Sequence, residues 1–79
     1  MTTEEALNQI KNHFDNIHVL DFTKYYVSVK IYCNVTFVIS YGSYENECFV
    51  TNSSCTDFHF KSLDKAIEYI ESKLKQNKS

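Results

Sequence analysis

Apolar residues recur at helical spacing at both ends of the chain. Near the N-terminus a helix is expected over residues 3–15, because apolar side chains spaced three, four and seven positions apart share one helical face. These side chains are Leu7, Ile10 and Phe14. Thr2 and Glu5 have the spacing of a capping box, which predicts that the helix begins just after Thr2.

The C-terminal segment predicts a second amphipathic helix. Ser62 is a good N-cap, since its hydroxyl can accept from the first free backbone N–H groups. The apolar stripe that follows consists of Leu63, Ala66, Ile67, Ile70 and Leu74. Because each helix has a single apolar stripe, each is expected to pack on one side only. Residues from about 76 to 79 are expected to fray.

Between the helices, apolar and polar residues alternate as in β-strands that have one buried face. Candidate strands cover residues 17–22, 24–33, 34–41, 47–51 and 55–60. The inward face of the first long strand is predicted to carry Tyr25, Val27, Val29, Ile31 and Cys33. Its outward face is predicted to carry Lys24, Tyr26, Ser28, Lys30 and Tyr32. In the next run, Val35, Phe37, Ile39 and Tyr41 are expected to point inward.

Matching the two apolar faces gives a hairpin register. It pairs Tyr25 with Tyr41 and Val27 with Ile39. The connection is then the three-residue loop 32–34, with Asn34 as the residue best suited to a positive φ.

These elements predict one α+β domain over residues 1–79, in the order α-β-β-β(-β)-α with three to five antiparallel strands. Both terminal helices are expected to pack on one face of the sheet. The other face would then be open to solvent, which makes it the expected place for function.

Composition narrows the class of function. The chain has 79 residues, a net charge of −2, one glycine and no arginine, proline or tryptophan. The abundance of Lys, Asn, Ile, Tyr and Phe indicates an AT-rich coding sequence, such as that of a low-GC bacterium or its phages. A nucleic-acid binder would more typically show a basic stripe rich in Arg. The first residues are acidic and polar, and no apolar run could span a membrane, so a cytoplasmic protein is expected.

No catalytic or metal motif is recognised. Cys33, Cys48 and Cys55 form no C-x-x-C pair, and the three histidines are scattered along the chain. Buried thiols that act as small apolar groups are the expected reading. A metal site of Cys48, Cys55 and His59 and a Cys48–Cys55 disulfide are the alternatives. Which of the three cysteines is reactive stays open. The single glycine excludes a phosphate-binding loop of the usual form. We therefore expect no enzyme, no metal and no cofactor.

The outward face of the long hairpin is the candidate binding surface. Its residues are Lys24, Tyr26, Lys30, Tyr32 and Val38. Exposed tyrosines are enriched at protein interfaces, and aromatic side chains interleaved with lysine can also stack nucleic-acid bases. A solvated strand face with high β-propensity is the third reading. Acidic Glu45 and Glu47, near Asp57, would steer a basic partner or protect strand edges.

Two resemblances bear on function. The element order resembles that of the double-stranded RNA-binding domain, which carries a Gly-rich, basic Lys-Lys motif at the start of its last helix. Here residues 60–66 keep Lys61 and Lys65, but Asp64 interrupts the basic cluster and no glycine precedes it, so RNA binding is not carried over.

By size and composition the chain also resembles small phage-encoded anti-defence proteins of the anti-CRISPR type. This resemblance implies a non-enzymatic inhibitor that blocks a host protein or nucleoprotein complex in the host cytoplasm. A homodimer is a further alternative. The expected function is protein binding, with nucleic-acid binding through the exposed Tyr and Lys residues as the alternative.

Overall fold

The computed structural model describes residues 2–32, 35–44, 47–52 and 57–76. In chain order the elements are α1 (Thr3–His13), β1 (Ile17–Phe22), β2 (Tyr26–Ile31), β3 (Phe37–Gly42), β4 (Glu47–Asn52), β5 (Asp57–Phe60) and α2 (Leu63–Gln76). The strands form one antiparallel sheet in the order β1-β2-β3-β4-β5, so every strand pairs with its neighbour in the sequence. The predicted α+β class and element order are confirmed.

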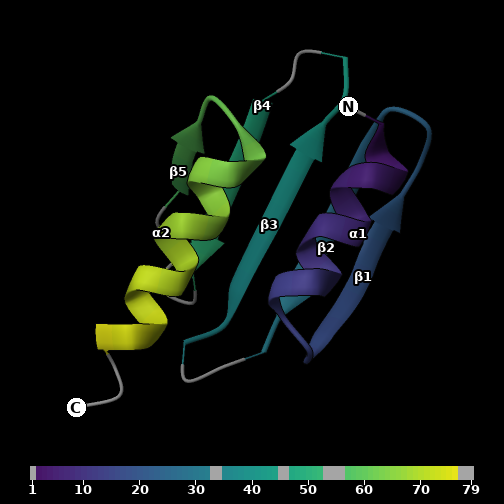
Figure 1. The fold of residues 1–79 in the computed structure, drawn as a ribbon. Coiled ribbons are helices and arrows are strands. Elements are labelled where there is room, and N and C mark those ends of the chain that lie inside the picture. Colours follow the sequence, from purple (N-terminus) through teal and green to yellow (C-terminus); the bar gives the residue numbers. More distant parts are fainter. Residues whose placement is uncertain (1, 33–34, 45–46, 53–56, 77–79) are drawn as a thin grey trace.

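Both helices cover the same face of the sheet (Figure 1). Helix α1 lies over β2 and β3, and α2 lies over β3, β4 and β5. The core between these layers is built from alternate strand positions and from one stripe of each helix. Its fully enclosed members, at 0% exposure, are Ala6, Ile10, Val27, Val29, Ile39, Cys48, Val50, Ala66 and Ile70. No described helix is long and apolar enough to cross a membrane.

Polar contacts join the two helices along the outer side of the helical layer. The Gln9 side-chain amide of α1 donates to the Asp64 carboxylate of α2. One turn further along α1 and two turns further along α2, His13 Nδ1 lies 3.4 Å from Glu71 Oε2. Both of these last side chains are 41% exposed, so this pair contributes little to stability compared with the apolar core beneath it.

The predicted N-caps of both helices are present. Thr2 Oγ1 accepts from the Glu5 backbone N–H at 3.1 Å, and Glu5 Oε1 accepts from the Thr2 N–H at 2.9 Å. This hydrogen bond from the Thr2 backbone lowers the pKa of the Glu5 carboxyl. Ser62 Oγ accepts from the Lys65 N–H at 3.3 Å. Helix α1 ends at His13, two residues earlier than predicted, because Phe14 is extended and turns its ring into the core.

The predicted hairpin register is wrong by two residues. Val27 pairs with Tyr41 and Val29 with Ile39, so the connection between β2 and β3 covers residues 32–36 in place of 32–34. The predicted faces nevertheless hold for the paired residues, because a shift of two residues leaves each side chain on its side of the sheet.

Tyr25 was expected to point into the core, but β2 begins one residue later and Tyr25 is 60% exposed. Several other predictions fall on residues outside those that the structure describes. They concern Cys33, Asn34, Glu45, Cys55, the side chain of Leu74 and the tail 77–79.

We predict that Thr2→Ala lowers the free energy of unfolding by about 1 kcal/mol, because it removes the hydroxyl that caps α1. Thr2→Ser, which keeps the hydroxyl, is the matched control and should lose much less. Urea denaturation followed by circular dichroism measures both differences. Equal stability of the alanine and serine variants would contradict a stabilising cap.

Candidate functional site

The face of the sheet opposite the helices carries the residues that alternate with the core positions. This open face consists of His18 and Asp21 on β1, Tyr26, Ser28 and Lys30 on β2, Val38, Ser40 and Gly42 on β3, Glu47, Phe49 and Thr51 on β4, and Asp57 and His59 on β5. No described helix or strand packs against it (Figure 1). Function is therefore sought here first.

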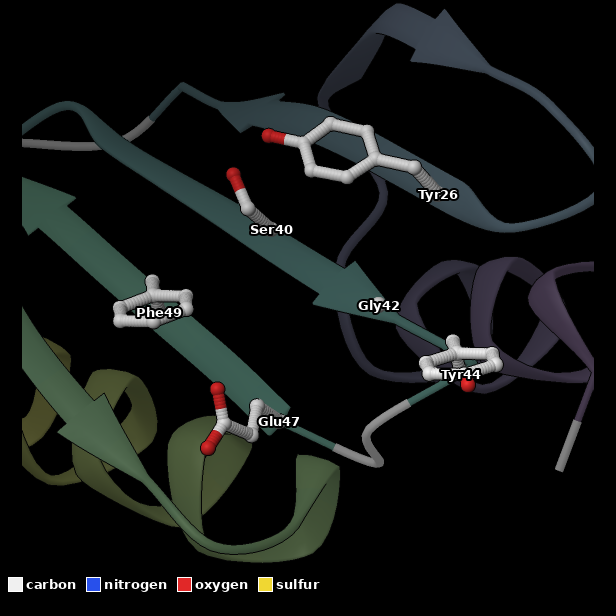
Figure 2. Close-up of a pocket in the computed structure, with 6 residues that line it drawn as sticks. All are labelled: Tyr26, Ser40, Gly42, Tyr44, Glu47 and Phe49. Atoms are coloured by element: carbon white, nitrogen blue, oxygen red, sulfur yellow. The ribbon is translucent and has the colours of Figure 1, made fainter.

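A hollow of about 250 Å³ lies on the open face, at the end of the sheet where β3 turns into β4. We call it the aromatic hollow, and its lining residues are Tyr26, Ser40, Gly42, Tyr44, Glu47 and Phe49. Figure 2 shows Tyr26 on β2 and Phe49 on β4, on either side of Ser40 and Gly42 of β3. The hollow exists because the middle strand carries small residues where its two neighbours carry rings.

The rings around the hollow are unusually open to solvent for aromatic side chains. Tyr26 is 40% exposed, Phe49 is 45% exposed and Tyr44 is 86% exposed. In contrast, Tyr41 and Phe37, which point to the other face of β3, are each 2% exposed. The Phe49 ring has no polar group, so its contact with water is unfavourable. Covering this ring with a partner would lower the free energy, which is typical of a binding surface.

A network of hydrogen bonds between threonine hydroxyls and backbone groups positions Tyr26 at the start of β2. Thr23 Oγ1 accepts from the N–H groups of Tyr25 and Tyr26, at 3.2 and 3.0 Å. The Thr23 carbonyl in turn accepts from Thr3 Oγ1 of α1 at 2.7 Å. The Ser43 N–H donates to the Tyr25 carbonyl at 3.0 Å. The turn before β2 is thus tied both to the first helix and to the turn that carries Tyr44.

The charge on the hollow comes from Glu47. Its Oε1 atom lies 3.5 Å from His59 Nε2 on β5, and the two side chains are 40% and 48% exposed. The His59 ring also lies beside the Phe49 ring, with 4.8 Å between the centroids. Among the described residues of the open face there is one lysine, Lys30, against the carboxylates of Asp21, Glu47 and Asp57.

Four of the five predicted surface residues lie on or at the end of the open face, but they do not form one cluster. Tyr26 lines the aromatic hollow. Lys30 and Val38 are directly paired nearer the other end of the sheet, and Lys30 Nζ lies 5.3 Å from the centroid of the Tyr32 ring. Tyr32 is 42% exposed just past the end of β2.

Lys24 is the exception, and its predicted place on the outward strand face is wrong. It precedes β2 in the turn from β1, where its backbone carbonyl accepts from Ser43 Oγ at 3.3 Å. Its side chain lines a separate hollow beside the start of α1, together with Thr2, Thr3, Glu4, Phe22, Tyr25 and Ser43. The strand begins later than predicted because Thr23 stabilises the turn.

Phe49, Tyr44 and Ser40 were missed as members of the site. Phe49 stands between Cys48 and Val50, so three successive apolar residues conceal which of them points outward. The structure resolves the choice, because Cys48 and Val50 are both fully buried and Phe49 therefore points to the open face. Tyr44 follows β3 in a turn, where no periodicity applies. Only the pairing of three strands brings these residues together.

The structure separates two of the residues considered as metal ligands, Cys48 and His59. Cys48 is fully buried on the helix-covered face, and burial raises the pKa of its thiol to about 12. His59 lies on the open face, so these two candidate metal ligands lie on opposite sides of the sheet. Among the described residues, no group of three or more His, Cys, Asp or Glu could hold a metal ion.

We predict that the Cys48 thiol of the folded protein resists alkylation. A pKa raised from 9.0 to about 12 leaves about a thousandfold less thiolate at pH 8, and burial also blocks the reagent. The measurement is the rate of thiol labelling in native buffer and in urea, in a chain with Cys33→Ser and Cys55→Ser. Equal labelling rates in the two solvents would contradict the burial of Cys48.

Comparison with known proteins adds no relative to this picture. No protein-family model matches the chain, and none of the curated proteins or solved structures searched matches it significantly.

Proposed function

We propose that this chain is a non-catalytic protein-binding module that contacts its partner through the open face of its sheet. The observation that carries the proposal is the group of exposed rings around the aromatic hollow, Tyr26, Tyr44 and Phe49. Aromatic side chains are the residues that most often supply binding energy at the centre of protein interfaces.

The shape of the site favours a macromolecule over a small-molecule substrate. Pockets for drug-sized ligands enclose about 300–1,000 Å³ and cover most of the ligand. The aromatic hollow has about 250 Å³ and lies on one face of a sheet. A flat surface with a shallow hollow near one end of the sheet suits a partner that contributes its own convex surface. It offers little means of excluding water from a reaction.

Charge favours a protein partner over nucleic acid on this face. Binding to phosphates requires several cationic side chains, each of which releases counterions. In the described part of the open face, Lys30 is the one lysine against three carboxylates, and its ammonium already lies over the Tyr32 ring. These charges support a partner with a neutral or basic contact surface.

The finer identification as a phage or mobile-element inhibitor of a host defence protein rests on size and composition. We retain it as a proposal about the partner, together with the cytoplasmic setting that it implies. Such an inhibitor needs no catalytic activity, because covering a functional surface of the host protein is enough to block that protein.

We predict that the immobilised chain captures a protein from a lysate of its native host cells, and that Tyr26→Ser with Phe49→Ser abolishes the capture. Loss of one central aromatic anchor typically costs about 2 kcal/mol or more, which is roughly a thirtyfold loss of affinity. Quantitative mass spectrometry of the bound fraction measures the ratio between the two forms.

Tyr25→Ser is the matched control, because Tyr25 is 60% exposed but lies outside the open face. Thermal unfolding shows whether each variant remains folded. Full capture by a folded double variant would contradict the proposal, and so would the absence of any protein specific to the wild-type chain.

For the nucleic-acid alternative, we predict no binding to single- or double-stranded DNA or RNA, even at low salt. Fluorescence anisotropy with labelled oligonucleotides at two salt concentrations provides the measurement. Binding at low salt that weakens steeply as salt is added would instead support the alternative, because phosphate contacts release counterions.

A further inference from the structure

The aromatic hollow has rings and a carboxylate but no cation from the described part of the chain. The described lysines that lie over aromatic rings contact tyrosines outside the hollow. Lys24 Nζ is 5.7 Å from the centroid of Tyr25, Lys30 Nζ is 5.3 Å from that of Tyr32, and Lys73 Nζ is 5.5 Å from that of Tyr69. Among described residues, none of these contacts involves Tyr26, Tyr44 or Phe49.

Lys30 is also too distant along the sheet to neutralise Glu47. Lys30 pairs with Val38, whereas Glu47 pairs with Gly42, four residues further along β3. At about 3.3 Å per residue the two positions are separated by about 13 Å along the strand. Among the described residues, the Glu47 carboxylate has one ionisable partner, His59, whose Nε2 atom lies 3.5 Å from Glu47 Oε1. The Glu47 side chain is 40% exposed, so a cation from outside can approach its carboxylate beside His59.

The hollow offers hydrogen-bond acceptors in addition to this carboxylate. Figure 2 shows the Tyr26 hydroxyl pointing toward the Ser40 hydroxyl across the floor of the hollow. Ser40 Oγ lies 3.3 Å from Ser28 Oγ, so Ser40 can donate to Ser28 and still accept from a ligand. Rings on the sides, hydroxyls on the floor and a carboxylate at one end together suit a flat cation with several N–H donors.

We propose that the aromatic hollow recognises an arginine side chain of the protein partner. This inference rests on the proposed function and names the chemistry of the contact. A guanidinium is planar, stacks on aromatic rings, gives up water more readily than an ammonium, and presents five donors in a fixed fork. A volume of about 250 Å³ is below the range of drug-sized pockets and suits one side chain.

The arginine must come from a different protein. This chain has eight lysines and no arginine, so a second copy of it could not supply a guanidinium group. The surplus of carboxylates on the open face also favours a basic partner surface around that arginine.

The test uses N-acetyl-arginine amide as the probe and the amide resonances of the ¹⁵N-labelled chain as the readout. We expect saturable shifts at Ser40, Gly42 and Phe49 with a weak, roughly millimolar affinity. The citrulline counterpart has nearly the same shape without the charge and should bind at least about tenfold more weakly. The lysine counterpart should also bind more weakly than arginine.

Two variants address the hollow itself. Glu47→Gln should weaken arginine binding by about tenfold, whereas Glu68→Gln on the outer side of α2 is the charge-matched control and should leave it unchanged. Gly42→Val should abolish binding, because its side chain would occupy the floor of the hollow. A Cβ at Gly42 would have no atom within 4 Å, so this variant is expected to fold.

No shift with arginine amide up to tens of millimolar would overturn the inference, as would equal binding of the citrulline or lysine probe. Other outcomes distinguish failure of the arginine assignment from failure of the proposed function. A captured partner whose binding is unaffected by Glu47→Gln would overturn the arginine assignment and leave the open face as the binding surface. A saturable arginine complex in a chain that captures no protein would support the hollow and contradict the proposed function.

Discussion

The architecture depends on one constraint: two helices cover one face of a five-stranded sheet, and no described element remains for the other. The covered face contains the fully buried Val27, Val29, Ile39 and Val50, against which both helices press their apolar stripes. Burial of this layer is the main favourable term in folding, at roughly 25 cal/mol per Å² of apolar surface.

The uncovered face must therefore remain compatible with water, and most of it does. Polar pairs such as Ser28 with Ser40, and Thr51 with Asp57, lie side by side on neighbouring strands. Phe49, 45% exposed in the middle of β4, departs from this pattern. An aromatic ring held in solvent on a rigid strand loses the stabilisation that burial would give, which is why we interpret it as a binding feature.

The small residues of β3 and the large residues of its neighbours act together. Gly42 and Ser40 lower the surface between Tyr26 and Phe49, and the resulting hollow lies beside the Glu47 carboxylate. Regular backbone hydrogen bonds hold these side chains in position, together with the turn that Thr23 stabilises. A site built on paired strands needs little rearrangement to bind, so less free energy is spent on ordering it.

The sequence by itself determined the elements, the caps and the buried faces, because helical periodicity, strand alternation and the Thr2–Glu5 box depend on residues close in the chain. It placed Tyr26 outward for the same reason. The sequence did not determine the register between β2 and β3. A shift of two residues leaves every side chain on the same face, so alternation cannot distinguish the two pairings. The aromatic hollow depends on that register: only the tertiary structure sets Tyr26 opposite Gly42 and Phe49 opposite Ser40, across three strands.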